Sequence, residues 1–393
     1  MEAATRKGRN LAVAILATAI VLGVGMRLGG LLSYVDFFGD QGRDALRFFD
    51  MHAGAWPTLG PETQLVQFRL PPLYYYVVAP FSWLGTAPAL QAIPNALFSI
   101  ASIVLLVFLV RRLLANVAEP SRSVIAAVAA LWWSVTFVDV FFANREWNPT
   151  PVPFVVFALI LLWSHQADRN RTRWDVLATP IAIGALLAFG VSCHASALYV
   201  LPVAFVVMSV MHIASAPRDW RSWTEVGLAL GFAVLCLTPY WIGEVQRGWS
   251  NTQHVVQSVY GGPGPHLSLF MQVRNTLGSY LGLANITIMP QTPKLVRVAT
   301  MIVLALLVVT FLFALRRPPG ERRALVALLT IWVVYLFAAS HVRQLLPHYR
   351  LPILFAPIVM SALIAGATFT RALPRKRTSE SAASMSPWML ADE

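Results

Sequence analysis

Charged residues are scarce in this chain, since Asp, Glu, Lys and Arg together make up 12% of its 393 residues. Ordinary soluble domains carry about 25%, roughly twice that fraction, whereas hydrophobic residues reach 57% here. Apolar runs long enough to cross a hydrocarbon core, which takes about 20 helical residues, recur along the whole chain. The composition therefore excludes a soluble globular protein and indicates an all-α polytopic membrane protein.

Cysteine is almost missing as well. Cys193 and Cys236 lie in or beside apolar runs and have neither a disulfide framework nor the spacing of a metal site. The formal net charge is +12, but most Lys and Arg residues sit in short loops between apolar runs. That distribution is typical of cytoplasmic loops under the positive-inside rule. We therefore expect the lipid bilayer as a partner and no nucleic acid.

The N-terminus resembles a signal peptide, because Arg6, Lys7 and Arg9 precede an apolar run that starts at Leu11. The run is longer than a typical signal-peptide core, and no convincing cleavage site follows it. We interpret it as an uncleaved first span whose N-terminus is cytoplasmic.

The pattern predicts about ten transmembrane helices, at 11–32, 89–110, 124–142, 152–163, 176–191, 198–211, 226–242, 295–315, 324–340 and 351–370. Segment 73–84 is aromatic and too short to span, so we expect an interfacial (juxtamembrane) helix in the first outer loop. A span there would turn the arginine-rich loops outward, against the charge rule.

The domain organisation follows from these spans. Residues 1–377 form one transmembrane domain, with a first outer loop at about 33–87 and a second at about 243–293. Residues 378–393 are rich in Ser and Ala and are expected to be a disordered tail. Both termini face the cytoplasm in this topology, and the protein is expected in the plasma (inner) membrane.

The first outer loop holds the most unusual stretch of the chain. Asp36, Asp40 and Asp44 are spaced four residues apart, so on a helix they share one face, with Arg43 and Arg47 beside them. One interpretation is a solvated helix with internal ion pairs. The other, which we favour, is a catalytic carboxylate site at the membrane surface. In either case Phe37, Phe38, Phe48 and Phe49 could dip such a helix into the edge of the bilayer.

Other polar residues also gather in the outer loops. The cluster from Asn144 to Asn148 follows the third crossing, with Asp139 just beneath it in the span. An ionisable group in hydrocarbon costs on the order of 3 kcal/mol, so Asp139 either pairs locally with Arg145 or serves the site. His194 fits a hydrogen-bonded structural histidine as well as a ligand.

Carboxylates beside arginines at a membrane surface suit transfer from a lipid phosphate. Arginine binds phosphate through a planar, permanently charged fork, and a carboxylate can take the proton of an attacking hydroxyl. Clustered carboxylates are also oxygen ligands for a divalent cation. The helical spacing does not establish such a site, so we assign no metal ligand and leave a divalent cation open as the only cofactor.

Several short motifs occur in an order that resembles the GT-C membrane glycosyltransferases. They are Asp40-Gln-Gly-Arg-Asp44, Pro71-Pro-Leu-Tyr-Tyr-Tyr76, Arg145-Glu-Trp-Asn-Pro149, His194-Ala-Ser-Ala-Leu-Tyr-Val-Leu-Pro202 and His348-Tyr-Arg-Leu-Pro352. The resemblance is to the family 39-like group, related to protein O-mannosyltransferases and the aminoarabinose transferase of lipid A. It covers nearly the whole chain.

The resemblance implies a catalytic acid at Asp40 in the first outer loop. That group usually has an Asp-Glu pair there, and Gln41 departs from it, so we expect Asp44 or Glu146 to act as a secondary acid. It also implies a polyprenyl-phosphate sugar donor, inversion at the anomeric carbon and a glycan, lipid or protein as hydroxyl acceptor, on the extracytoplasmic side. The expected substrate-binding residues are Arg43, Arg69, Tyr74, Arg145, Trp147, Asn148, His194, Arg343, His348 and Arg350.

The main alternative is a transporter or flippase of a lipid-linked sugar, in which the same residues bind without chemistry. Transporters tend to place ionisable groups near the bilayer midplane, on broken helices and in paired repeats. No repeat is evident in this sequence, and its polar residues gather at one face, so the pattern favours the enzyme.

Overall fold

The computed structural model describes residues 2–33, 39–63, 68–85, 87–168, 170–260, 317–339 and 356–372. In these ranges the regular elements are helices. One isolated antiparallel bridge, between Glu62 and Arg69, occurs besides them. The helices are α1 (Glu2–Ser33), α2 (Gly39–His52), α3 (Leu73–Ser82), α4 (Pro88–Leu113), α5 (Ser121–Ser134), α6 (Phe137–Ala143), α7 (Val152–His165), α8 (Arg173–Cys193), α9 (Ala195–Ser215), α10 (Trp220–Cys236), α11 (Thr238–Gln246), α12 (Ser250–Tyr260), α15 (Pro319–Ala339) and α16 (Ala356–Ala372).

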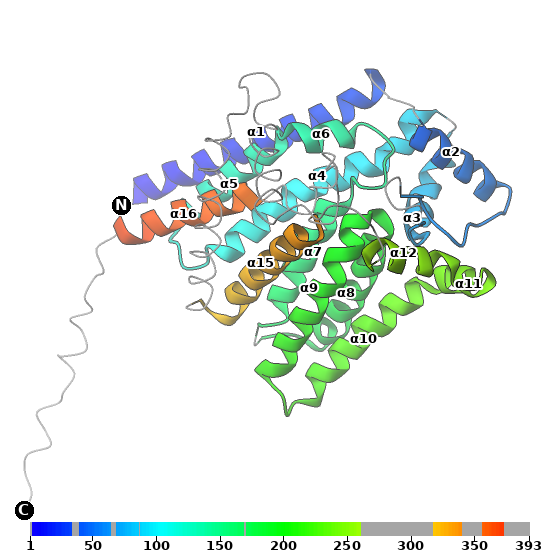
Figure 1. Ribbon diagram of the computed structural model, residues 1–393. Helices are drawn as coiled ribbons and strands as arrows, with labels where there is room; N and C mark the ends of the chain where they lie inside the picture. The colour runs from blue at the N-terminus through cyan, green and yellow to red at the C-terminus, as the bar shows by residue number, and fades with distance from the viewer. Residues whose placement is uncertain are drawn as a thin grey trace, which may run out of the picture.

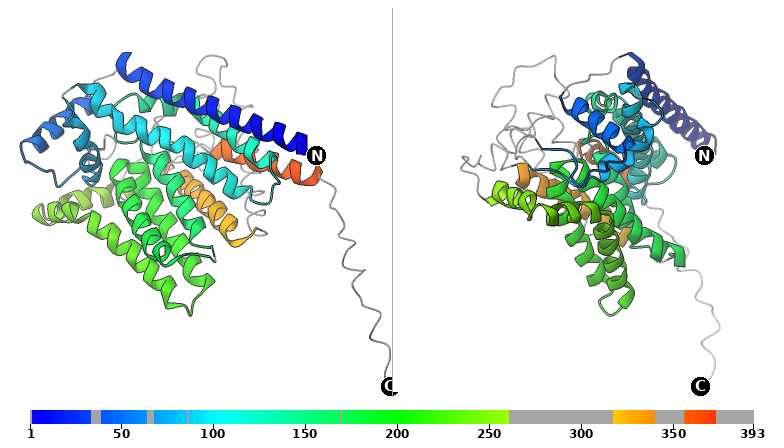
Figure 2. Two further views of the ribbon diagram at one scale, coloured as in Figure 1. Left: turned by 180° about the vertical axis from the view of Figure 1, so that it is seen from behind. Right: turned by 90° about the vertical axis from the view of Figure 1, so that its right-hand side faces the viewer.

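The long helices pack side by side as a bundle (Figure 1). Helix α1 lies along α5, and α4 packs against both α5 and α7, while α8 packs on α9 and α10 and α15 covers α7 and α9. The start of α1 and the end of α16 lie at one end, and α2 and α3 lie at the opposite end of α1 (Figures 1 and 2). We call the end that carries α2 and α3 the acidic end.

By length and composition, α1, α4, α8 and α9 can each cross a membrane, and two bent helix pairs raise the count to six within the described ranges. The expected span at 89–110 corresponds to α4, and the short segment after the paired prolines is the helix α3, as predicted. The expected span at 295–315 and most of the second outer loop lie outside the described residues. The total of ten spans stays a prediction.

Two expected spans are not single helices. The segment at 124–142 is broken into α5 and α6, which are bent by 56°. The break exposes the backbone carbonyls of Trp133 and Ser134, and the Arg27 guanidinium donates to both. The segment at 226–242 is broken into α10 and α11, bent by 55°. Pro239 lies in the first turn of α11, where its missing N–H and fixed φ fit a new helix start.

The pairing of Asp139 with Arg145 is wrong. Asp139 Oδ2 instead accepts from Arg27 Nη2 at 2.6 Å, and the Ser99 hydroxyl also donates to this oxygen. Arg27 belongs to α1, and its side chain and that of Asp139 are 0% and 1% exposed. A buried charge is tolerated when it is paired and hydrogen-bonded, so this pair binds α1, α4 and α6 together inside the bundle.

Helix α8 begins with a capping box, in which the Thr172 hydroxyl accepts from the Asp175 N–H and Asp175 accepts from the Thr172 N–H. Further along, α8 approaches α10 closely at Gly184, where a Cβ atom would lie 2.3 Å from the Ala229 carbonyl oxygen. Only glycine fits there, which is typical of close helix packing in membrane proteins. These contacts fix α8 beside α10.

Candidate functional site

The acidic helix forms at the predicted place. Helix α2 begins at Gly39, so Asp40 lies in its first turn, and Asp36 falls outside the described residues. Arg43 joins Asp40 and Asp44 of this helix, because Nη1 donates to Asp40 Oδ1 at 3.1 Å and Nε donates to Asp44 Oδ1 at 2.8 Å. The side chain of Asp40 is 23% exposed and that of Asp44 is 0% exposed. The two acids therefore differ in access to a substrate.

Two details of this helix correct the sequence interpretation. Arg47 pairs with Asp50 at 3.1 Å and not with Asp44, because Asp44 points into the protein. Phe48 is buried and packs edge-on against Tyr75 with ring centroids 5.9 Å apart. It anchors α2 on α3 instead of reaching the bilayer edge. Phe49, by contrast, is exposed, and Phe37 and Phe38 lie outside the described residues.

Two adjacent tyrosines of α3 hold two buried acids. The helix starts at Leu73 directly after the paired prolines, so both tyrosines lie in its first turn. Tyr75 donates its hydroxyl to Asp44 Oδ1 at 2.5 Å, and Tyr74 donates to Glu146 Oε1 at 2.6 Å. The first turn of α3 therefore links α2 to the loop that follows α6.

Glu146 belongs to that loop, which Asn95 of α4 fixes in place. The Asn95 amide donates to the carbonyl oxygens of Arg145 and Trp147 at 3.0 Å each, and to the Tyr74 hydroxyl at 3.3 Å. Glu146 is 3% exposed. Backbone contacts on both sides of Glu146 thus determine where its carboxylate lies.

The acids influence one another electrostatically. Burial raises the pKa of Asp44, although the hydrogen bond and charge of Arg43 oppose this. Burial also raises the pKa of Glu146 well above its ordinary value, and the charge of Asp44 adds to the effect. Burial and the neighbouring carboxylates raise the pKa values of Tyr74 and Tyr75, so both remain hydroxyl donors.

The three acids of this site differ in burial and in hydrogen bonding. Asp44 and Glu146 each keep one buried oxygen that has no hydrogen-bond partner within the described part of the chain. Asp40 is the most accessible of the three acids. A partly exposed carboxylate beside a guanidinium can accept a proton and meet an anionic group, whereas the two buried acids are closed to a substrate.

Arg145 directly precedes Glu146 in the loop after α6. It is 9% exposed, its guanidinium carbon lies 3.8 Å from the centre of the Phe141 ring, and its Nε donates to the Phe141 carbonyl at 3.2 Å. Trp147 packs edge-on against Phe142 with ring centroids 4.5 Å apart. The side chains on either side of Glu146 are thus held by α6.

The other expected site residues are more scattered. The Asn148 amide donates to the Cys193 carbonyl, and His194 Nδ1 accepts from the Ser196 N–H and so caps α9. Arg69 contacts Glu62 at 3.5 Å, and its backbone N–H and carbonyl both bond to the side-chain amide of Asn251. Arg343, His348 and Arg350 lie outside the described residues. Within the described ranges, no three His, Cys, Asp or Glu side chains are grouped to hold a metal ion.

Three residues of this region were missed by the sequence interpretation. Tyr75 and Asn95 hold Asp44 and the Glu146 loop, but their residue types and spacing gave no signal that separated them from neighbours. Arg27 did give a signal, because an arginine inside an apolar run of this length needs a partner.

No protein-family model matches the sequence, and no curated protein matches it. Solved structures do match the fold. ArnT from Cupriavidus metallidurans in the apo state has a TM-score of 0.55 at 17% identity, over 93% of this chain and 59% of ArnT. ArnT bound to undecaprenyl phosphate gives a TM-score of 0.53 at 17% identity, over 93% of this chain and 60% of that one.

The Archaeoglobus fulgidus oligosaccharyltransferase in complex with Zn and sulfate gives a TM-score of 0.50 at 14% identity, over 91% of this chain and 49% of that one. At these identities the likeness shows the fold. The chain is an all-α polytopic membrane protein with the fold of the GT-C glycosyltransferases, which confirms the fold class expected from the motifs. It spans 59% of the length of the ArnT chain that it matches.

Proposed function

We propose that this chain is a membrane glycosyltransferase that moves a sugar from a polyprenyl-phosphate donor to a hydroxyl of a glycan, lipid or protein, on the extracytoplasmic side. The observation that carries this proposal is the acid cluster of Asp40, Asp44 and Glu146 on the GT-C fold, held by Arg43, Tyr74 and Tyr75. The similar ArnT structure contains undecaprenyl phosphate, which supports a lipid phosphate as the donor group.

The proposed reaction uses Asp40 as the general base. Asp40 accepts the proton of the acceptor hydroxyl, whose oxygen forms a bond to the anomeric carbon as the bond from that carbon to the phosphate oxygen breaks. Attack opposite the leaving group inverts the anomeric centre. The lipid phosphate leaves with both bonding electrons, and guanidinium groups stabilise its charge. Arg43 and Arg145 are proposed to supply such groups, and Arg343 and Arg350 to complete the clamp.

The buried acids are proposed to act through Asp40. A negative Asp44 beside Arg43 competes with Asp40 for the same guanidinium, since Arg43 bonds to both carboxylates. Asp44 therefore positions Arg43 and Glu146 positions Tyr74, while Tyr74 and Trp147 shape the wall for the sugar. The clustering of acids at one end of the bundle supports transfer over transport, because transporters tend to hold such groups at the midplane.

Replacement of single acids tests this assignment. Asp40→Asn keeps the shape and removes the proton acceptor, so release of polyprenyl phosphate from labelled lipid-linked sugars should fall by about 10²–10⁴-fold. Binding of undecaprenyl phosphate should be nearly unchanged. Asp44→Asn should reduce turnover less, and Asp50→Asn is the matched control, because Asp50 lies on the same helix with its side chain 50% exposed.

Two outcomes would contradict the roles. If Asp40→Asn turns over normally and Asp44→Asn is inactive, the base is the other aspartate. If both turn over normally, the acidic helix is structural. Movement of labelled sugar lipid across a sealed vesicle without release of polyprenyl phosphate would instead identify a transporter.

A second set of variants tests the phosphate clamp. Arg145→Lys keeps the charge but loses the planar fork, so the affinity for undecaprenyl phosphate should fall while the protein still folds. Wild-type affinity in both Arg145→Ala and Arg343→Ala would mean that other residues hold the phosphate.

A further inference from the structure

An open apolar groove runs between α8 and α10, far from the acid cluster. The two helices run in the same direction, because Arg171 at the start of α8 reaches Glu225 near the start of α10 at 2.9 Å, while Gly184 contacts Ala229 further along. The groove has a volume of about 440 Å³, and Ile181, Thr224, Gly227, Gly231 and Leu235 line it.

Two glycines keep this groove open. Gly227 and Gly231 are four residues apart, so they lie on one face of α10. Apart from the chain neighbours and the nearby backbone of α10, no heavy atom lies within 4 Å of the position that a Cβ atom would take at either glycine. A side chain added at either glycine would therefore point into open space, and no described side chain fills it.

One end of the groove carries arginine and tryptophan. The helical face that includes Thr224 continues back to Arg221 and Trp220, three and four residues earlier. On α8, the face of Ile181 continues back to Trp174, seven residues earlier. Trp174 and Trp220 are 78% and 69% exposed, and Arg221 is exposed as well. Tryptophan side chains favour the headgroup level of a membrane.

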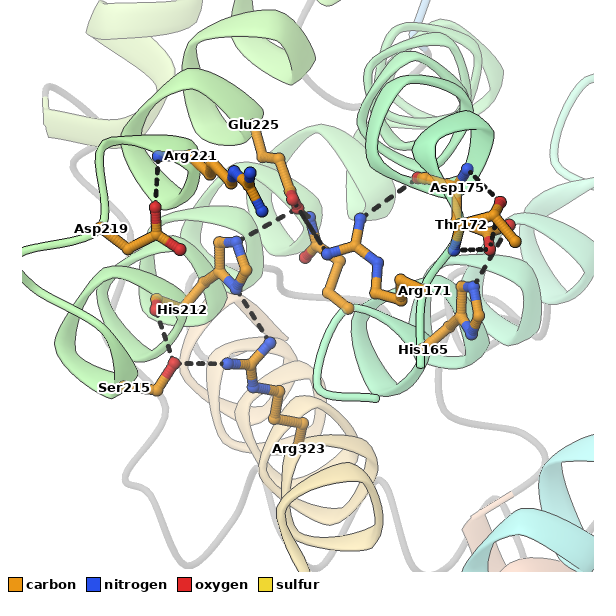
Figure 3. A network of polar contacts seen from close by, with 11 residues as sticks. His165, Arg171, Thr172, Asp175, His212, Ser215, Asp219, Arg221, Glu225 and Arg323 are labelled. Carbon is orange, nitrogen blue, oxygen red and sulfur yellow. Dashed lines mark hydrogen bonds and ion pairs between the residues drawn. The ribbon is translucent and has the colours of Figure 1, made fainter. Parts of the chain in front are cut away.

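The carboxylates at this end already have partners (Figure 3). Glu225 binds Arg171 and lies 3.2 Å from His212, which accepts a hydrogen bond from Arg323. Asp175 caps the first turn of α8, and Asp219 accepts from the backbone N–H of Arg221. The exposed guanidinium of Arg221, with Arg173 on the first turn of α8, therefore presents positive charge beside the mouth of the groove.

We propose that this groove binds one acyl chain of an anionic phospholipid, whose phosphate lies against Arg221 and Arg173. An apolar channel that ends in tryptophan and arginine is complementary to a molecule with an apolar chain and an anionic head. The glycine pair alone would also accept a helix from a second copy of the protein. An apolar helix would, however, place no negative charge against Arg221 and Arg173. This lipid site is independent of the acid cluster and of the reaction proposed there.

Native mass spectrometry of the full chain in detergent tests the proposal. The protein is titrated with dioleoylphosphatidylglycerol or dioleoylphosphatidylcholine, and the mass reports both bound lipid and the number of protein copies. Arg221→Gln should weaken phosphatidylglycerol binding about fivefold, the contribution of one basic residue near an anionic lipid, and leave phosphatidylcholine unchanged. Gly231→Leu places a large apolar side chain in the groove, with its Cβ in open space, and should weaken binding of both lipids.

Two control variants separate this site from general effects. Gly25→Leu adds the same side chain on α1, where a Cβ also has nothing within 4 Å, and Arg9→Gln removes an exposed arginine of α1. Both should bind lipid as the wild type does. The proposal fails if the controls lose as much binding as the groove variants, or if Arg221→Gln and Gly231→Leu bind phosphatidylglycerol normally. It also fails if Gly231→Leu only converts dimers to monomers, since the occupant would then be a second copy.

Discussion

Replacing Asp139 by alanine should strongly destabilise the protein, because it leaves a buried arginine without its counter-charge. Arg27 of α1 is completely buried inside the bundle, and its guanidinium lies 2.6 Å from Asp139 Oδ2 and 2.5 Å from the Ser99 hydroxyl oxygen. Its Nη1 also donates to the carbonyls of Gly23 and Ser134, at 3.1 and 2.8 Å. In Asp139→Ala the carbonyls remain, but no negative charge faces the cation.

The size of the effect follows from this environment. Removing one partner of a buried ion pair typically costs about 3–5 kcal/mol. The carbonyl acceptors around Arg27 reduce the loss in free energy of unfolding, so we expect the lower end of that range. The double variant Arg27→Met with Asp139→Leu should recover most of the loss, because it removes both charges together. Asp50→Ala is the control, since the side chains of Arg47 and Asp50 are 41% and 50% exposed and such pairs contribute about 1 kcal/mol or less.

Denaturation in a single detergent, followed by circular dichroism, measures these free energies of unfolding. The expected order of stability is wild type and Asp50→Ala highest, the double variant next and Asp139→Ala lowest. Equal stability of Asp139→Ala and Asp50→Ala would refute the buried pair. A double variant as unstable as Asp139→Ala would show that the side-chain shapes, and not the charges, determine the effect.

Three further predictions concern the site and the topology. Glu146→Gln should stabilise the protein increasingly from about pH 4 upward. The raised pKa of Glu146 means that the folded state binds its proton more tightly than the unfolded chain. The wild type therefore loses stability relative to the variant as pH rises above the ordinary pKa of glutamate. A difference in melting temperature between variant and wild type that stays constant from pH 4 to 8 would contradict this. Tyr75→Phe removes a hydrogen bond to the buried Asp44 and should cost about 1.5–3 kcal/mol, measured by the same denaturation, whereas an unchanged midpoint would mean that Asp44 does not need this partner. Cysteines near Arg112, Arg171 and Arg322 should react only with membrane-permeant reagents in intact cells, and cysteines near Glu62 and Gly261 also with impermeant ones; labelling of the Glu62 and Gly261 positions from opposite sides would break the ten-span topology.

Much of the fold could be predicted because the signals are local. Apolar runs and the basic loops between them predict helices such as α4 and α8, and the two prolines before Leu73 predict the start of α3. The breaks in α5–α6 and α10–α11 were missed. At Pro239 the sequence contained the reason, whereas at Val135 the break depends on Arg27, which lies more than one hundred residues away along the chain.

In the candidate site too, the sequence predicts local contacts but not contacts between distant segments. The pairing of Arg43 with Asp40 follows from helical spacing, so the sequence predicts it. The burial of Asp44 does not follow from spacing, because it depends on how α2 rotates onto Tyr75. For the same reason, spacing does not show that Arg47 pairs with Asp50 and not with Asp44. Contacts between distant segments, such as that of Asn95 with the Glu146 loop, have no signature in a single sequence.

The most direct test of the central claim is an experimental structure of the full chain with undecaprenyl phosphate. The proposed function predicts density for the phosphate at the acidic end of the bundle, within ion-pair distance of Arg43 or Arg145 and next to Asp40. Phosphate density in the middle of the bundle, or only at the opposite end beside Arg221, would contradict a lipid-phosphate transferase site at the acid cluster.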